Sequence, residues 1–536
     1  MKKSIPLFIV VLMLLARPSS PQERADLVEA FTPASAICVV KTSRLNKFMT
    51  VLNTAIQKFF PRKEAESIAK KRSEIKAKTG IDLLDVESLK KAGIDANRSV
   101  SLAVFPKGAR GEGQFLIFLP VNDAKVFPLA FIEFFRKASQ NTEEYPVITP
   151  YRDFTVYQIG KDIFITSFDG TCAIGSTGEI IRKVIDAKAD NTGYLAVDPR
   201  YADYLNRTPR RGDLSVYMTR ELLKEAIKRA RPQISENSGA EHKGSKEGET
   251  EIDRFMKGPS SFNAVDYASL DLSATGTRVD ASVSIKFNEQ DTSVNAVMNV
   301  IRLGMSGNAL YLKGAATYIF LSIDMPKLEE FCSVNAAGCR TYQEFKDALY
   351  QELGIDIAKD IAPFSNGPIN IVAGQPKGAG GGFCISLPLR DSQSKKIWNA
   401  SAAYLKNKYQ GTERFGVSGA NTYWYIDGKN VRTSGAWDAR GIYLSNDPAL
   451  LSQTMAAKDM TDAPGNDSLA VRLSKNVFFL AMIKKDSFFG ALLSLYANRE
   501  PWLSPLVNQM EELWMVGEKS DLFLTFEASV HVRKKK

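Results

Sequence analysis

Apolar and polar residues alternate along several short segments of this chain. Clear cases are Arg278–Phe287 (RVDASVSIKF) and Asp521–Val532 (DLFLTFEASVHV), in which every second residue is apolar. A period of two places successive side chains on opposite faces of a strand, so both segments are predicted to be half-buried β-strands. Ser99–Phe105 (SVSLAVF) and Phe115–Pro120 (FLIFLP) are more apolar and predict a hairpin around a glycine-rich turn.

Other segments carry apolar residues at helical spacing. The longest set is Leu45, Phe48, Met49, Leu52, Ala55, Ile56 and Phe59. Further helices are predicted at Asp123–Lys137, at Gly178–Ala187 and, in the second half, at Ser392–Lys406. Short strands joined by hairpins, with helices between groups of them, predict an α+β fold. Each domain would be a largely antiparallel sheet with helices packed on one face.

One phrase occurs twice in the chain. Gly113–Asp123 reads GQFLIFLPVND, and Gly381–Asp391 reads GGFCISLPLRD. Pro-Lys-Gly precedes both copies, and the interval from Pro120 to Gly160 in YQIGKD equals the interval from Pro388 to Gly428 in YIDGKN. A preserved interval with matching ends indicates two copies of one domain, with this phrase as a central strand of each. The separation is too long for a solenoid repeat.

The outer parts of the two copies agree more loosely, which sets the predicted boundaries. Ala36–Phe48 is similar to Tyr318–Phe331, and Asp213–Ile227 to Asn476–Leu492. We therefore predict a first copy at 26–290 and a second at 313–536, joined by a connecting helix or linker at 291–312. The first copy holds a polar insertion at 233–250, which is predicted to be a mobile loop.

The first residues have the layout of a secretory signal. Two lysines precede the apolar run Ile5–Ala16, and Arg17–Pro21 ends it with polar residues and prolines. Twelve helical residues span about 18 Å, less than the roughly 30 Å core of a bilayer. We predict a signal peptide at 1–25 and export to the periplasm or the extracellular space, with an uncleaved N-terminal membrane anchor as the alternative.

Composition places the chain among ordinary globular proteins. It has 536 residues, of which 44% are hydrophobic and 24% charged, with a formal net charge of +10. Three of the five cysteines lie in strand-like apolar runs, where cysteine acts as a small hydrophobic residue. Cys332 and Cys339 instead flank a short turn-rich segment in a chain that carries an export signal. Two alternatives stay open for this pair, a local disulfide and two free thiols.

Several features together resemble an uncharacterised family of exported bacterial proteins, defined only as a domain of unknown function. They are an opening strand followed by a polar turn, a Gly-Ile-Asp element, the hairpin into FLP or SLP, the YxxGK turn and a late strand before a helix. The resemblance covers nearly the whole mature chain in two tandem copies. It implies a location in the cell envelope and an α+β architecture, and it supplies no catalytic residues.

Several chemistries lack the residues that they need. The two histidines, His242 and His531, lie in different copies and unlike settings, so a serine–histidine or cysteine–histidine nucleophile is not supported. The chain has no HExxH motif and no paired CxxC motifs, so no zinc site is predicted, and no cofactor either. Pro376–Phe383 is glycine-rich, but predicted strands flank it on both sides. A hairpin turn is therefore favoured over a phosphate loop.

Four positions recur in both copies and are candidate site residues. Asp82 and Asp356 follow Gly-Ile, and two such carboxylates at a suitable separation could hydrolyse a polysaccharide. A helix-end turn or a helix cap explains the same pattern and is favoured. Lys161 and Lys429 each follow a turn glycine, which most simply marks the tip of a β-turn.

Two basic stretches, Arg62–Lys78 and Arg533–Lys536, could meet anionic lipid or acidic polymers at a membrane surface. Such stretches are more often a solvated helix face and a frayed tail. Nucleic acid is not a predicted partner. The sequence favours a non-enzymatic cell-envelope protein that binds an envelope protein or another ligand through a sheet surface or a cleft between the copies. The alternatives are a carrier of an apolar, lipid-like ligand and a carboxylate-dependent hydrolase of envelope polysaccharide.

Overall fold

The computed structural model of the chain describes residues 31–59, 62–106, 113–139, 145–207, 212–223, 264–275, 277–290, 292–303, 310–312, 315–334, 339–374, 382–408, 413–418, 421–427, 432–459, 477–487, 489–491, 493–494 and 504–532. The predicted signal peptide, the polar insertion at 233–250 and Lys429 lie outside these residues. In the described part of the chain, no helix combines the length and the apolar character that a membrane span requires.

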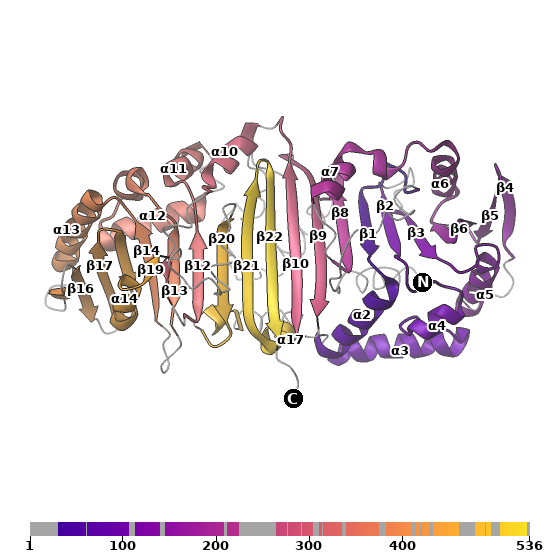
Figure 1. Ribbon diagram of the computed structural model, residues 1–536, viewed down its shortest axis with the longest axis horizontal. Coiled ribbons are helices and arrows are strands. Elements are labelled where there is room, and N and C mark those ends of the chain that lie inside the picture. The colour runs from indigo at the N-terminus through magenta and orange to yellow at the C-terminus, as the bar shows by residue number, and fades with distance from the viewer. Residues whose placement is uncertain are drawn as a thin grey trace, which may run out of the picture.

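The described strands build one continuous sheet of 20 strands, and all neighbours in it are antiparallel (Figure 1). Ten come from the N-terminal half, in the spatial order β4–β5–β6–β7–β3–β2–β1–β8–β9–β10. Their bounds are β1 Cys38–Thr42, β2 Ser101–Phe105, β3 Gln114–Pro120, β4 Val147–Tyr151, β5 Phe154–Ile159, β6 Ile163–Phe168, β7 Thr171–Gly175, β8 Leu214–Thr219, β9 Val265–Thr275 and β10 Arg278–Phe287.

The other ten strands come from the C-terminal half, in the spatial order β15–β16–β17–β18–β14–β13–β12–β20–β21–β22. Their bounds are β12 Thr317–Leu321, β13 Ile369–Ala373, β14 Phe383–Pro388, β15 Glu413–Ser418, β16 Asn421–Asp427, β17 Arg432–Asp438, β18 Gly441–Ser445, β20 Val477–Lys484, β21 Met510–Ser520 and β22 Phe523–Val532. A separate pair joins β11 (Leu310–Tyr311) and β19 (Lys458–Asp459).

Corresponding strands of the two halves have the same spatial order. In each half this order runs from a strand at the outer edge of the sheet to the long last strand of that half. The repeated phrase forms β3 in one half and β14 in the other, at the same place in that order. The glycine-rich segments join β2 to β3 and β13 to β14, which are antiparallel pairs, as the predicted hairpins require. The last strands, β10 and β22, pair along nine residues, so the two sheets meet edge to edge and continue as one.

Helices of the N-terminal half are α2 Leu45–Phe59, α3 Arg62–Thr79, α4 Val86–Lys91, α5 Phe127–Ser139, α6 Gly178–Asp190 and α7 Pro199–Arg207, with a 3₁₀ turn, η1, at Leu195–Val197. α10 (Thr292–Val300) lies in the predicted connection. The C-terminal half has α11 Met325–Val334, α12 Arg340–Leu353, a π-helical turn η4 Ile357–Ile361, a 3₁₀ turn η5 Ala362–Phe364, α13 Asp391–Lys408, α14 Pro448–Met455 and α17 Ser504–Gln509.

The α+β class and the antiparallel sheet are confirmed, but the helices cover both faces of the sheet rather than one. On β1, Val39 packs with α6 and α7, whereas its neighbours Cys38 and Val40 pack with α2. We call these the α6 face and the α2 face. In the C-terminal half, α14 lies on the α6 face and α11–α13 lie on the α2 face. The reason is that inner strands such as β1 and β7 are buried at every position, so each face needs a cover.

The strand β4 forms one outer edge of the sheet, because among the described strands it pairs with β5 alone. Tyr151 and Phe154 close a two-residue turn and therefore form a hydrogen-bonded pair. The next position along β4, Pro150, is then a non-hydrogen-bonded position, so its backbone nitrogen faces away from β5 and toward the open edge. Val147 and Ile148 in this strand are each 59% exposed.

Candidate functional site

The four strands where the halves meet, β9, β10, β22 and β21, carry only apolar residues along the middle of one face. In the register of the sheet, three rows cross these strands on the α2 face. The rows are Leu270–Val283–Phe526–Gly517, Leu272–Ala281–Ala528–Met515 and Ala274–Val279–Val530–Leu513. We call these twelve residues the central strip. The alternation that predicted strands at Arg278–Phe287 and Asp521–Val532 is what places them on one face.

Burial on these strands runs opposite to the usual rule. Within the central strip, Val283 is 36% exposed and Phe526 is 39% exposed, and every other residue except Gly517 is also partly exposed. The other face of the same strands is mostly polar, although it also carries the buried Trp514 and Val516 of β21 and the exposed Glu527. Five of its polar side chains are at most 7% exposed: Ser269, Asp271, Ser273, Ser284 and Ser529. A half-buried sheet normally buries its apolar face and solvates its polar one.

The buried polar face is held by hydrogen bonds between neighbouring strands. The Ser215 hydroxyl donates to Asp271 Oδ1 at 2.5 Å, and Ser284 and Thr525 share a hydrogen bond of 3.1 Å between their hydroxyls. Near the other end of these strands, Arg278 donates from Nη2 to Ser529 Oγ at 2.9 Å. Buried polar groups are tolerated when they are bonded in this way. On the same face, the Ser269 hydroxyl is buried without a hydrogen-bond partner among the described residues.

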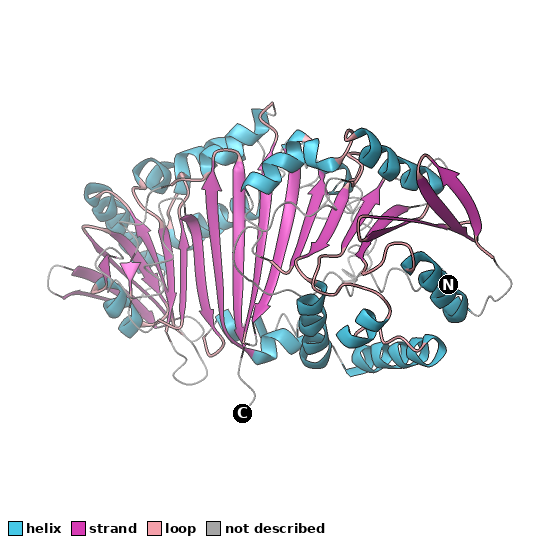
Figure 2. Ribbon diagram, turned by 45° about the vertical axis from the view of Figure 1, so that its right-hand side comes forward, coloured by secondary structure: helices cyan, strands magenta, loops and turns pink. Residues whose placement is uncertain are grey.

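The helical layers stop short of the middle of the central strip. In Figure 1 and Figure 2, the described helices lie beside or at the ends of β21, β22, β10 and β9, and none crosses their middle. α10 lies at one end, where Met298 and Val294 pack with Leu524 and Phe478. α17 lies at the other end and contacts α2. Among the described elements, none covers the middle of the strip, where Val283 and Phe526 are exposed.

One charged side chain marks the α10 end of the strip. Lys519 lies one row beyond Gly517 on the same face, and its ammonium group donates to the carbonyl oxygens of Met298 and of Ile301, the latter at 3.2 Å. Burial lowers the pKa of Lys519. These bonds hold the end of α10 against the sheet.

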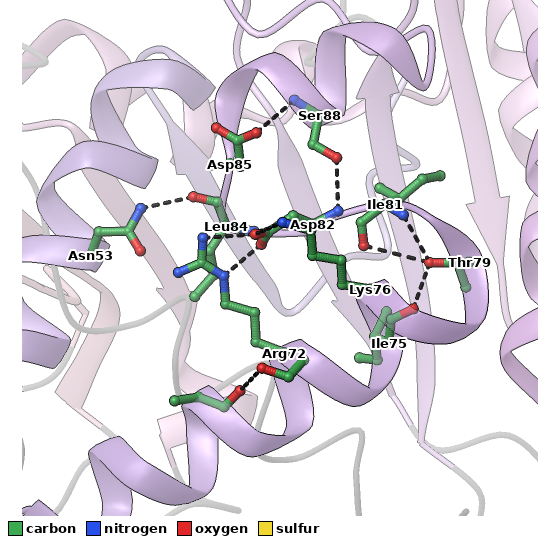
Figure 3. A network of polar contacts seen from close by, with 12 residues as sticks. Asn53, Arg72, Ile75, Lys76, Thr79, Ile81, Asp82, Leu84, Asp85 and Ser88 are labelled. Atoms are coloured by element: carbon green, nitrogen blue, oxygen red, sulfur yellow. Dashed lines mark hydrogen bonds and ion pairs between the residues drawn. The ribbon is translucent and has the colours of Figure 1, made fainter.

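Asp82 lies far from the strip, in a network between α3 and α4 (Figure 3). Its carboxylate accepts from Arg72 Nε at 2.5 Å and from Arg72 Nη2 at 2.9 Å, and its side chain approaches Lys76 Nζ at 3.6 Å. It also accepts from the backbone N–H of Leu84 at 3.2 Å. These bonds, with the Arg72 hydrogen bond as the largest cause, lower the pKa of Asp82 although burial opposes the shift. A carboxylate held in this way ties α3 to the following turn.

We expect Asp82→Asn to lower the free energy of unfolding by about 1–2 kcal/mol at pH 7, because Arg72 loses its charged partner while staying partly exposed. The pKa of Asp82 is lower in the folded chain than in the unfolded chain, so its contribution is complete above about pH 4 and disappears as the pH falls further. Urea denaturation at pH 7 and at pH 3 measures both effects. Glu87→Gln, in an exposed pair with Lys90, is the control and should cost under about 0.5 kcal/mol; an equal loss at both pH values would contradict the assignment.

The second Gly-Ile-Asp element gives Asp356 a capping role. Its Oδ1 accepts from the backbone N–H groups of Ala358 and Lys359 at the start of η4, and it pairs with the Lys359 ammonium at 3.0 Å. In both copies the glycine of the element ends the preceding helix in the left-handed region, at φ 75° for Gly80 and 67° for Gly354. The structure therefore places these carboxylates in helix-end turns, in separate halves, and does not bring them together.

The remaining predicted positions fall into two groups. Lys161 is exposed in the turn between β5 and β6, where Gly160 has φ 60°, and its counterpart Lys429 lies outside the described residues. Cys332 at the end of α11 and Cys339 before α12 lie within hydrogen-bond contact of each other as free thiols. Burial and the neighbouring Cys339 thiol raise the pKa of Cys332 to about 12. The disulfide stays a prediction, and the structure places the two sulfurs side by side.

Three further features of the described residues bear on the sequence predictions. A cavity lined by Gly354, Ile355, Asp360, Lys396, Ile397 and Ala400 has a volume of about 30 Å³, room for one or two water molecules. Within the part of the chain that the structure describes, no three histidine, cysteine or acidic side chains gather as metal ligands. The basic helix α3 keeps Lys70, Lys71 and Lys78 exposed, in line with a solvated helix face.

Neither a protein-family model nor a curated protein matches the chain. Among solved structures it is similar to crystal form IV of TP0453, at 10% sequence identity and a TM-score of 0.25, over 48% of this chain and 79% of that one. Crystal form III of TP0453 matches at 11% identity and a TM-score of 0.25, over 51% and 87%. Likeness at this level carries no argument about fold or function, and the resemblance to an uncharacterised exported family stays a prediction.

Proposed function

We propose that this chain is an exported, non-enzymatic protein of the cell envelope that binds a partner or ligand through the central strip. The observation that carries the proposal is the burial of β9, β10, β22 and β21, where five polar side chains on one face are at most 7% exposed while Val283 and Phe526 on the apolar face stay exposed. Leaving apolar surface in water costs about 25 cal/mol per Å². A contiguous apolar patch of this kind marks an interaction site on a soluble surface.

We also infer that the two halves arose by duplication of one domain. The repeated phrase, the preserved intervals and the common strand order support this origin. Joining two such sheets through their last strands, β10 and β22, creates the central strip at the junction. Because the strip uses residues from both halves, the binding surface belongs to the joined pair and to neither half alone.

The two alternative functions have less support. A carrier of an apolar molecule needs a pocket of several hundred Å³, and the cavity beside Ile355 and Ile397 is about 30 Å³. A polysaccharide hydrolase needs two facing carboxylates about 5–10 Å apart. Asp82 and Asp356, the repeated candidates, are engaged in an ion pair and a helix cap in different halves.

The proposed surface is tested by a fluorescent apolar dye such as bis-ANS. We expect the dye to bind the wild-type chain and to bind Phe526→Asp at least tenfold more weakly, because the charge removes the apolar character of the middle of the strip. Phe345→Asp is the matched control, since Phe345 is 55% exposed on α12, away from the strip, and its loss should leave dye binding unchanged. Equal dye binding by Phe526→Asp and the wild type would remove the strip as the site.

A further inference from the structure

The occupant of the central strip follows from its shape, its size and its surroundings. Resting on the proposed function above, we infer that the strip binds one amphipathic α-helix of a partner protein, laid along β10 and β22. Three separate observations favour a helix over a second copy of this chain, a free apolar molecule or a membrane.

The first observation is the size of the strip. Four strands spaced by about 4.8 Å and three rows spaced by about 6.8 Å give an apolar area of roughly 300 Å². A stable dimer buries about 800 Å² on each partner, so the strip alone does not suffice for a second copy. A helix of about ten residues is about 15 Å long and 10 Å wide, which matches the length of the three rows.

The second observation is that no described helix covers the outward side of the strip, where Val283 and Phe526 are exposed. A free apolar molecule lying on it would keep half of its surface in water, and apolar ligands are bound in concave sites that cover most of them. An amphipathic helix has one apolar stripe and a polar back that stays hydrated. The apolar stripe of such a helix would lie against the strip, and its polar side would face water. An apolar surface that is exposed on one side therefore matches an amphipathic helix.

The third observation is the difference in side-chain size across the strip. In its middle row, the small residues Ala281 and Ala528 lie between the large side chains of Leu272 and Met515. On the row above, Phe526 is held by an edge-on contact with Phe478, with ring centroids 5.8 Å apart. The alanine pair forms a shallow depression at the junction of the halves. A leucine of the incoming helix fills it, while leucines at i−4 and i+3 contact the flanking rows.

The helices on either side of the strip also favour a helix as its occupant. On the α2 face, α2 covers the N-terminal half and α11–α13 cover the C-terminal half with apolar stripes of their own. The central strip interrupts this layer of described helices (Figure 2). A further helix from a partner would continue the layer across the junction.

The test uses the full chain and a fluorescein-labelled helical peptide of about 15 residues with leucines at i, i+3, i+4 and i+7 and Ala, Glu and Lys elsewhere. Fluorescence anisotropy measures its Kd. We expect the peptide to bind the wild type and to bind Val283→Asp and Phe526→Asp at least tenfold more weakly. Val126→Asp and Phe345→Asp, at residues 60% and 55% exposed outside the strip, should bind it like the wild type. A peptide of the same composition with its leucines spread around the helix should bind at least tenfold more weakly.

A second variant separates this inference from the proposed function and avoids a buried charge. Ala281→Leu fills the depression, so we expect about a tenfold loss of peptide affinity with bis-ANS binding retained. Unchanged peptide affinity in Ala281→Leu, or equal affinity for the two peptides, would overturn the helix as occupant. Binding of bis-ANS, or strip-dependent binding of phosphatidylglycerol vesicles, without peptide binding would also overturn it while leaving a ligand-binding strip. Loss of all three would remove the proposed function as well.

Discussion

Gly441→Ala is expected to destabilise the chain by about 3 kcal/mol or more. Gly441 begins β18 opposite Pro388, and a Cβ atom there would lie 2.9 Å from the carbonyl carbon of Leu387 and from Pro388 Cα, and closer still to the Leu387 carbonyl oxygen. Carbon atoms that are not bonded pack at about 3.5–4.0 Å. The obstacle is the backbone of β14, which cannot move aside as a flexible side chain can, so β14 and β18 would have to separate.

The measurement is the midpoint of urea and thermal unfolding of the purified chain. Gly113→Ala is the control, because a Cβ at Gly113, which precedes the corresponding strand β3, meets nothing within 4 Å. The control should shift the midpoint little or raise it slightly. Similar midpoints for the two alanine variants would mean that β14 and β18 do not approach each other as closely as the sheet requires.

Ser284→Pro is expected to cost at least about 3 kcal/mol and to disturb the junction between the two halves. Ser284 lies in β10 between β9 and β22, opposite Ser269 on one side and Thr525 on the other. Each backbone N–H of a strand with neighbours on both sides donates to one of them, and proline removes that donor and is not accommodated inside a sheet. The pairing of β10 with β22 should open first.

Hydrogen exchange measured by mass spectrometry locates the effect. We expect faster exchange in β9, β10, β21 and β22 of Ser284→Pro and little change in the outer strands β5 and β6. Ser284→Ala keeps the backbone donor and loses only the hydroxyl contact with Thr525, so it should cost about 1 kcal/mol. If exchange in β22 matched the wild type in the proline variant, the continuous sheet across the junction would be refuted.

Much of the fold can be predicted from local patterns. The repeated phrase at Gly113–Asp123 and Gly381–Asp391 leads to β3 and β14, which hold the same place in the two strand orders. The helical spacing from Leu45 to Ile56 leads to α2, whose apolar side is buried. The preference for a helix-end turn over a catalytic carboxylate at Asp82 and Asp356 agrees with the ion pair and the cap described above. These features depend on residues close in sequence.

The central strip could not be predicted in the same way. Alternation in Arg278–Phe287 indicates that one face of the strand is apolar and the other polar, but it does not tell which face is covered. That depends on β22, which lies more than two hundred residues further along the chain. The prediction that helices lie on one face failed for a related reason. An unbroken apolar run such as Cys38–Val40 needs cover on both sides, and only the packing of α2, α6 and α7 supplies it.

The proline at the margin of β4 has a consequence for how the molecule behaves in a crowded compartment. The edge strand of a 20-stranded sheet has unpaired backbone groups that can pair with a strand of another molecule. The exposed side chains of Val147 and Ile148 would favour this pairing, because they would be buried by it. The backbone nitrogen of Pro150, which faces the open edge, has no hydrogen to donate, and the proline ring occupies the place where an added strand would pair. On this side, a single residue therefore disfavours the addition of a further strand and growth into ordered fibrils.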